Sequence, residues 1–365
     1  MDFSVDLIQR IRTQIGLEPD SDEAFSMLHP SGNDHLVQFY FKNLDGAYFE
    51  FDEWDRHNLF LCDLTKGLGF EFVLDEDGQF ATLRLSEASQ VRTVEAVMDL
   101  RDDYLVTIYY FGDAKTSQRF NQQLMATERL CPCYVGTVLM EQLICELETI
   151  NRVDYEFEQL SSSFLEPVVL KGSVIGKLSQ TVFGQYTQNY RSFFNIKSIG
   201  GQLSDDTQGH ILFFSGGMIQ MTDCRLSDVM KLSSQLFYLL RMKYKSLVEK
   251  CLMTWETSDG TQKSLLTGNL IEICLGQSMD KVDGLLKFLT RGDKTLTLMG
   301  ISERVSRKLW SIKTVHVETG ARIECEISTA MLRVYLMDRL SIPLLDKIED
   351  FLQRHITVDF ENLVY

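Results

Sequence analysis

The residues best suited to chemistry in this sequence are short clusters of carboxylates and thiols. Asp75-Glu76-Asp77-Gly78 offers the oxygen ligands of a calcium loop, but such a loop also needs a Glu at its twelfth position, which here is Ser86. A solvated hairpin turn explains this cluster better. Cys131-Pro-Cys133 offers two thiolates for zinc, but no second Cys or His pair follows at ligand spacing. We therefore expect no metal site.

Motifs of enzymes and of cofactor sites are equally absent from the sequence. It contains no phosphate-binding loop, no dinucleotide fingerprint, no nucleophile elbow and no zinc-protease motif. The histidines form no cluster, since they stand at positions 29, 35, 57, 210, 316 and 355. We expect no cofactor and no enzymatic activity, although an unrecognised catalytic site stays open as an alternative.

The composition is that of a globular chain with a sizeable core. Hydrophobic residues make up 44% of the 365 residues, with 23 Phe and only five Pro, which excludes a low-complexity chain. No apolar run approaches the roughly 18 residues of a membrane span. Asp2 and Asp6 stand where a signal peptide carries positive charge, and the eight cysteines are scattered. We expect an intracellular protein, cytoplasmic or nuclear, that makes no contact with a membrane.

Charge is distributed unevenly along the chain. The net charge of −16 argues against general nucleic-acid binding, because phosphate contacts are made mainly by Lys and Arg. Residues 1–160 hold 12 basic and 30 acidic residues, whereas residues 161–250 hold 10 and 6 and residues 251–365 hold 14 and 16. The acidity therefore belongs to the first part, and the middle is mildly basic.

Residues 1–150 predict an acidic domain of α+β class with antiparallel strands. Hydrophobic periodicity predicts helices over 4–15 and 138–150. Turn-forming residues at 43–46 and 75–78 predict two hairpins. The strands are expected at 36–41, 47–51, 70–73, 80–85 and 105–111.

Two further α+β domains are predicted at 151–250 and 251–365. In the first, strands are expected at 155–164, 193–199, 210–214 and 218–222, a short helix at 175–183 and a long helix at 227–248. In the second, a strand at 270–275 and a helix at 279–289 precede strands at 295–299, 309–317, 321–327 and 331–337 and a helix at 342–355.

Two windows of the sequence indicate an internal duplication. Residues 211–227 (ILFFSGGMIQMTDCRLS) and 323–341 (IECEISTAMLRVYLMDRLS) each contain a strand that ends at a Ser. In each, a Met three residues later opens the next strand, and Arg-Leu-Ser leads into an amphipathic helix. Ser227 and Ser341 are the expected N-caps of these helices.

The first window resembles the signature of the TATA-binding-protein repeat. That family has Phe-x-Ser-Gly-Lys before an apolar strand and Thr-Gly-Ala-Lys before a long helix. By this resemblance Phe214 falls on a wedge phenylalanine, Gly217 on the turn glycine, Thr222 on a groove-facing threonine and Arg225 on the basic residue after it. Upstream, the stretches 167–172 (PVVLKG) and 183–186 (FGQY) are similar to the family's lead-in, and Phe193 or Phe194 lies near its second wedge.

The resemblance covers about residues 155–356, the first copy better than the second. It implies that each copy has the order β-α-β-β-β-β-α, with helices on one side of a curved antiparallel sheet. It also implies that the concave face lies on the DNA minor groove, which offers little hydrogen-bonding information and suits an apolar surface. Inserted Phe side chains then kink the duplex, and the sequence-dependent cost of bending gives specificity.

The sequence departs from the family's pattern at several groove-facing positions. Gln220 stands where the family has a small apolar residue, and Arg333 and Tyr335 occupy the groove-facing positions of the second copy. Further departures are Met218 in place of a phosphate-facing Lys, Asp223 in place of a Gly and Ile327 in place of a wedge Phe. A diverged saddle is therefore predicted. Diverged copies of this kind occur in initiation factors of large cytoplasmic DNA viruses, such as the intermediate-stage factor of poxviruses.

Each of these signals also has a purely structural interpretation. Phe214 can be a core residue like its neighbour Phe213, because successive strand residues point to opposite faces. The basic residues Arg241, Lys243 and Lys245 are predicted to bind a partner protein, but they can also simply complement the dipole at the end of the long helix. The acidic residues 1–150 can be a solvated surface, a DNA mimic that covers the saddle, or a surface that docks on a basic protein.

Two functions are therefore carried forward. The first is a transcription initiation factor subunit that engages double-stranded promoter DNA together with a second factor subunit and an RNA polymerase or general transcription factor. Its predicted DNA-binding residues are Phe193, Phe194, Phe214, Gln220, Thr222, Arg225, Arg333 and Tyr335. The second is a protein-interaction scaffold that keeps the fold without binding DNA.

Overall fold

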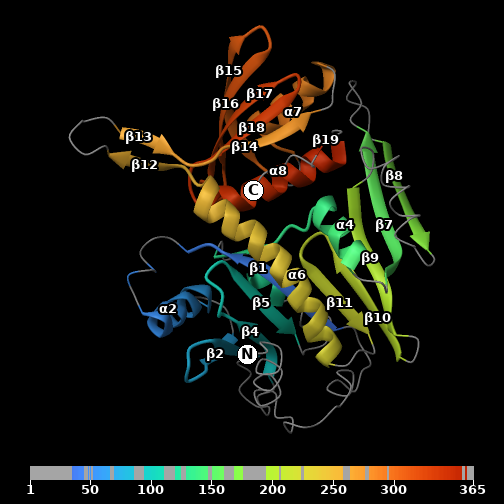
Figure 1. Cartoon of the computed structure of the whole chain (residues 1–365). Helices are drawn as coiled ribbons and strands as arrows, with labels where there is room; N and C mark the ends of the chain where they lie inside the picture. Colours follow the sequence, from blue (N-terminus) through green and yellow to red (C-terminus); the bar gives the residue numbers. More distant parts are fainter. Residues whose placement is uncertain are drawn as a thin grey trace. The chain divides into compact units, whose positions relative to one another are not determined.

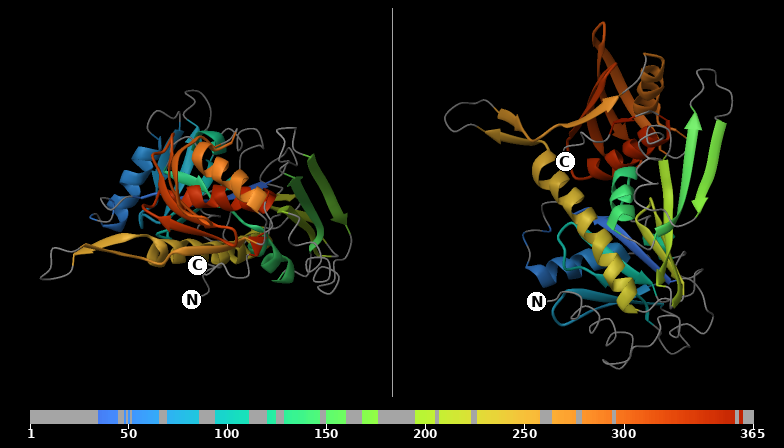
Figure 2. Two further views of the ribbon diagram at one scale, coloured as in Figure 1. Left: turned by 90° about the horizontal axis from the view of Figure 1, so that it is seen from above. Right: turned by 45° about the vertical axis from the view of Figure 1, so that its right-hand side comes forward.

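A computed structural model confirms the predicted α+β class (Figures 1 and 2). It describes residues 35–44, 48, 50, 52–65, 70–85, 94–110, 120–124, 129–146, 150–159, 168–175, 195–204, 207–222, 226–257, 264–275, 279–293, 296–355 and 358–359. The predicted helix at 4–15, the segment 176–183 of the predicted short helix, Phe193, Phe194 and Arg225 lie outside these residues.

The chain divides into two compact units that are not continuous in sequence. The first comprises Met1–Val135, Leu143–Val153 and Ser198–Arg241, and the second Gly136–Gln142, Asp154–Lys197 and Met242–Tyr365. These limits differ from the domain boundaries predicted near residues 150 and 250. The difference arises because strands from the first and the middle parts of the sequence share one sheet.

The sheet of the first unit runs in the order β2-β3-β4-β5-β1-β11-β10-β9, with β6 added to the end of β1. Every neighbouring pair along this order is antiparallel. Its strands are β1 (His35–Lys42), β2 (Phe70–Leu74), β3 (Phe80–Leu85), β4 (Val94–Asp99), β5 (Leu105–Tyr110), β6 (Leu130–Pro132), β9 (Asn195–Ser204), β10 (Thr207–Phe214) and β11 (Met218–Thr222).

Both faces of the β1–β5 part of this sheet are covered. On one face, Tyr40, Met98 and Ile108 pack in a core cluster with Phe60 of α2 (Glu53–Thr65) and with Phe120 of the helical segment 120–124. On the other face lies α6 (Leu226–Ser246), whose first part belongs to this unit and whose Ser233 is hydrogen-bonded to Tyr109 (Figure 1).

α2 was not predicted from the sequence. Tyr48 and Glu50 form 3₁₀ turns where a strand at 47–51 was expected, so the prediction of that strand was wrong.

The β1–β11 ladder joins the acidic N-terminal strands to the window that resembles the TATA-binding-protein repeat. Leu36 lies opposite Gln220, and Gln38 lies opposite Met218. The described strands of residues 1–150 therefore extend this sheet sideways. They do not form a detachable cover over its face, so a fragment that begins at residue 151 loses the strand beside β11.

The second unit is built around a sheet in the order β15-β16-β17-β18-β14-β19. The strands are β14 (Ile271–Leu275), β15 (Leu298–Ser306), β16 (Leu309–His316), β17 (Arg322–Ser328), β18 (Met331–Leu336) and β19 (Val358–Asp359). Two helices, α7 (Met279–Arg291) and α8 (Ser341–His355), pack on one face, where Phe288 stacks on Phe351 with ring centroids 3.6 Å apart. Gly300 allows α7 to approach β15, since a Cβ there would lie 2.8 Å from the Leu289 oxygen.

The remaining elements of the described chain are one helix, a π-helical turn and two further pairs of strands. α4 (Thr137–Glu146) confirms the helix predicted at 138–150, and the long helix α6 continues as a π-helical turn at Leu247–Cys251. β7 (Ile150–Gln159) and β8 (Val168–Ile175) are neighbouring strands. β12 (Thr254–Thr257) and β13 (Ser264–Thr267) form a separate hairpin that extends away from β14–β18 in both figures.

The two windows of the predicted duplication have the same local structure. Each forms an antiparallel hairpin, β10–β11 or β17–β18, that precedes a helix, α6 or α8. Ser341, the predicted N-cap of α8, is the first residue of that helix. The Asp338 carboxylate accepts the Ser341 amide at 2.9 Å, and the Ser341 hydroxyl accepts the Asp338 amide at 3.2 Å, so these two residues close the turn that leads into the helix.

The two units share a second similarity, in the order of their elements, which the sequence did not indicate. Residues 35–110 run β1-α2-β2-β3-β4-β5, residues 271–336 run β14-α7-β15-β16-β17-β18, and both sets of strands have the same order across the sheet. Residues 271–355, with α8 added, thus have the order β-α-β-β-β-β-α.

Candidate interaction faces

The hairpin β10–β11 presents three of the predicted residues on one face. Phe214 lies opposite Met218, and Gln220 lies opposite Leu212, in the register that also pairs His210 with Thr222. Side chains on this face are half-buried or exposed, whereas those of the alternate positions, Phe213, Ile219 and Met221, are fully buried. The shared face of Phe214, Gln220 and Thr222, predicted from their parity, is therefore confirmed.

The turn between these strands is held firmly by its neighbours. Gly217 has a φ of 69°, and a Cβ there would lie 2.5 Å from the Cys133 oxygen, so only glycine fits. The buried amide of Gln38 donates to the carbonyl oxygens of Gly216 at 2.8 Å and Gly217 at 3.1 Å. These contacts fix the position of Phe214, which precedes the turn, relative to β1.

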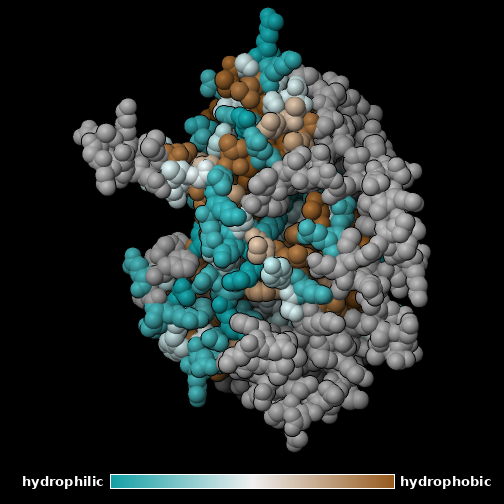
Figure 3. Space-filling view, in the orientation of Figure 1, coloured by the Kyte–Doolittle hydropathy of each residue, from teal (hydrophilic) through white to brown (hydrophobic). Residues whose placement is uncertain are grey.

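The β14–β18 sheet has a second face that none of the described helices covers. Alternation places the buried residues of β17 and β18 toward α7 and α8, and leaves Glu324, Glu326, Arg333 and Tyr335 on the opposite side. Its apolar part lies on β15 and β16, where Met299, Ile301 and Val315 are 70%, 79% and 37% exposed. Figure 3 shows hydrophobic surface at the top of the molecule, over these two strands.

Charged groups on this uncovered face are paired with one another. The Arg333 guanidinium lies 2.9 Å from Glu272 and 3.5 Å from Glu326, and these hydrogen bonds raise its pKa. Burial and the charge of Glu326 raise the pKa of Tyr335, which is also hydrogen-bonded to Glu326. Lys313 lies 3.2 Å from Glu324. Arg333, predicted to face DNA, is thus on the expected face, but its charge is already committed to two carboxylates.

The three basic residues of α6 that were predicted to bind a partner lie in different environments. Lys243 is buried, and its Nζ donates to Asp346 at 2.7 Å and Glu349 at 2.9 Å, both on α8. Arg241 is ion-paired with Asp102, and Lys245 forms an exposed pair with Glu249. The prediction is corrected for Lys243, because helical spacing alone did not reveal that this lysine points into the second unit's interior.

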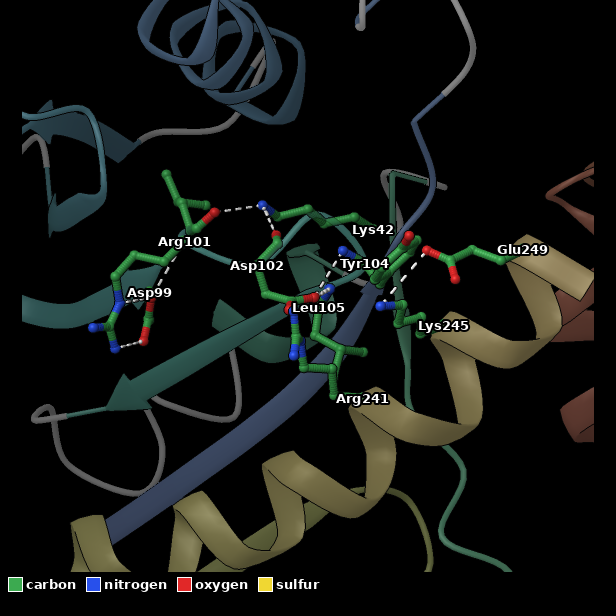
Figure 4. Close-up of polar contacts among 10 residues, drawn as sticks. Lys42, Asp99, Arg101, Asp102, Tyr104, Leu105, Arg241, Lys245 and Glu249 are labelled. Atoms are coloured by element: carbon green, nitrogen blue, oxygen red, sulfur yellow. Dashed lines mark hydrogen bonds and ion pairs between the residues drawn. The ribbon is translucent and has the colours of Figure 1, made fainter. Parts of the chain in front are cut away.

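The loop after β4 brings together several buried polar contacts of the first unit (Figure 4). Buried Lys42 donates from Nζ to the carbonyl oxygens of Leu100 at 2.6 Å and Asp102 at 2.5 Å. The Asp102 carboxylate accepts the backbone amides of Tyr104 and Leu105 and binds Arg241. Burial lowers the pKa of Lys42 from 10.5 to about 8, although the charge of Asp102 opposes this shift.

The lowered pKa of Lys42 predicts a stability that rises with pH. Between pH 8 and 10.5 the unfolded chain binds more protons at this site than the folded chain, so deprotonation favours folding. We expect the free energy of unfolding to increase by about 1 kcal/mol from pH 7 to pH 9 relative to the variant Lys42→Met. Urea titrations at the two pH values measure this, and the same pH dependence in both proteins would contradict it.

Among the described residues no group of three or more potential ligands could hold a metal ion. The Asp75 carboxylate accepts the backbone amides of Gln79 at 2.7 Å and Phe80 at 3.0 Å, and Gly78 has a φ of 72°. The sequence at 75–78 is thus the hairpin turn that was predicted. None of the described helices is long and apolar enough to span a membrane.

A family described as MJECL33-like protein matches residues 230–340, from α6 to β18. No curated protein and no solved structure matches the chain. The match includes most of the uncovered face of β14–β18 and leaves out the β10–β11 hairpin.

Proposed function

We propose that the protein is a subunit of a transcription initiation factor that contacts promoter DNA through the β10–β11 face. The observation that carries this proposal is the register that places Phe214, Gln220 and Thr222 together on an uncharged sheet face. Such a face suits the minor groove, whose edges offer few hydrogen bonds and where an apolar wedge can open a base step. The order β-α-β-β-β-β-α of residues 271–355 is the one that the resemblance to TATA-binding protein implies.

In this proposal promoter DNA and a protein partner bind to different faces. On the β14–β18 face, Glu272, Glu324 and Glu326 would repel phosphates, and the nearby cations are bound to them. That face therefore suits a protein partner. In this proposal the partners are promoter DNA, a second factor subunit and an RNA polymerase or general transcription factor.

A fluorescence-anisotropy titration of the full chain on an A·T-rich duplex tests the proposal. We expect salt-sensitive binding that Phe214→Ala weakens about tenfold, or roughly 1.4 kcal/mol. Phe72→Ala is the matched control. Phe72 is also half-buried in the first unit's sheet, but it lies on β2, several strands away from β10 and β11. Arg333→Ala is expected to change the affinity less than twofold, because its guanidinium is already paired.

A second candidate function is an assembly scaffold that does not bind DNA. The observation that favours it is that Arg333 is ion-paired with Glu272 and Glu326, so that carboxylates outnumber cations around it. If the full chain fails to bind the duplex at low salt, the contact between the β10–β11 face and DNA is disproved and the scaffold function is supported.

A further inference from the structure

The strand β15 forms one edge of the β14–β18 sheet. It is nine residues long, which corresponds to about 30 Å, and its described sheet neighbour is β16 alone. The opposite edge differs, because β19 lies beyond β14. β2, the strand in the same topological position in the first unit, has only five residues. β15 therefore presents an unusually long edge.

The side chains of β15 do not protect this edge from pairing. Proteins usually blunt exposed edge strands with proline, short length or several charges. β15 has no proline, and its two charges, Glu303 and Arg304, are of opposite sign. Three of its residues are exposed apolar side chains: Met299, Ile301 and Val305 are 70%, 79% and 58% exposed. The irregularity between Arg304 and Ser306 affects only its end. Such a strand is a template for another strand.

The surface immediately beside this edge is apolar. Val315 lies opposite Met299 on β16, and Val317, just beyond it, is 52% exposed. Further along the face the cations Lys313 and Arg333 are each paired with carboxylates. A chain with a net charge of −16 repels its own copies over most of its surface, so an apolar area whose neighbouring cations and carboxylates are paired is where two copies can approach.

We infer that the chain self-associates through antiparallel pairing of β15 with β15 of a second copy. A two-fold axis at Ser302 would place Met299 of each copy opposite Val305 of the other, and Ile301 opposite Glu303. In this register no charged residue lies directly opposite a like charge, whereas an axis at Glu303 would set two glutamates face to face. The strand is thus complementary to itself, as an isologous interface requires.

Sedimentation velocity of the full chain across a concentration series tests this inference. We expect a dimer, and we expect Ile301→Glu to raise its dissociation constant about 30-fold or more, because each new glutamate would lie directly opposite Glu303 of the other copy. Ile301 is 79% exposed, so the variant should fold normally. Val73→Glu, at an exposed position of β2, is the control and should remain dimeric. A chain that is monomeric throughout, or a dimer insensitive to Ile301→Glu, would overturn the inference.

Cysteine cross-linking tests the proposed register directly. Opposed residues of antiparallel strands have Cα atoms about 4.5–5.5 Å apart, a distance that a disulfide spans. Ser302→Cys should therefore cross-link two copies under mild oxidation. Ser306→Cys should not, because its two copies would be about 26 Å apart. Equal cross-linking of both variants would overturn pairing about Ser302. Neither measurement depends on DNA, so this inference and the proposed function can fail separately.

Discussion

Replacement of Lys243 with methionine is expected to lower the free energy of unfolding by about 3–5 kcal/mol. Lys243, Asp346 and Glu349 form a buried cluster in which one ammonium group balances two carboxylates, and Tyr244 donates to Asp346 at 2.5 Å. The loss of the lysine leaves both carboxylates in the interior without a counter-charge. Urea unfolding of the full chain measures the effect.

The control for this prediction is Lys245→Met, two residues further along α6. Lys245 and Glu249 are 43% and 46% exposed and 3.9 Å apart, so their pair contributes about 0.5 kcal/mol or less. Equal losses of stability in the two variants would show that Lys243 is not the buried partner of α8.

The same cluster predicts how the Lys243→Met defect depends on pH. Burial already raises the pKa of Asp346 from 3.8 to about 6 with the lysine present, and loss of the lysine raises it further. A raised carboxyl pKa means that the folded state takes up protons as the pH falls, which stabilises it relative to the unfolded chain. The defect should therefore be smaller at pH 5 than at pH 7.5, and a constant defect would point to lost packing instead.

Elements with one covered face were the most predictable from the sequence. β17 and β18 alternate buried and half-buried side chains, because α7 and α8 cover only one side of their sheet. That alternation appears directly in the sequence as period-two hydrophobicity. β1 and β5 are buried on both faces, but their short apolar runs are flanked by turn residues, so they were also recognised.

The helix α2 and the joining of β1 to β11 were not predictable by this reasoning. α2 buries only a few side chains among many charged ones, among them Phe60, Leu61 and Leu64, so its apolar stripe is too narrow to recognise. The β1–β11 pair joins residues about 180 positions apart, and period-two hydrophobicity does not tell a strand which neighbour it has. The domain boundaries predicted from composition could not take this pairing into account.

The alternation of side chains along a strand predicted which residues share the β10–β11 face. The ion-pair partners of the charged residues, in contrast, become visible only in the tertiary structure. Lys243 looked like part of a basic helix end, and its partners lie more than 100 residues later. A signal did exist: Asp346 and Glu349 interrupt an apolar pattern formed by Leu345, Ile348 and Leu352 on α8. Carboxylates three residues apart in such a helix indicate a buried cation nearby.

Replacing each of the two adjacent phenylalanines of β10 should change the stability by very different amounts, because their environments differ. Phe213 is fully buried, opposite buried Ile219 of β11, so Phe213→Ala is expected to cost about 3–5 kcal/mol of stability. Phe214 is half-buried on the other face, and Phe214→Ala should cost no more than about 1–2 kcal/mol, because less apolar area leaves water when it folds. Urea unfolding followed by tryptophan fluorescence compares the two variants.

The comparison also decides whether the β10–β11 face can serve as a recognition surface. A side chain that contacts a ligand must contribute little to the fold, so the smaller loss for Phe214→Ala is a condition for its proposed role at DNA. If the order were reversed, Phe214 would be the core residue and Phe213 the accessible one. The face shared with Gln220 and Thr222 would then point inward, and DNA contact through it would be physically impossible, whatever the affinity of the full chain.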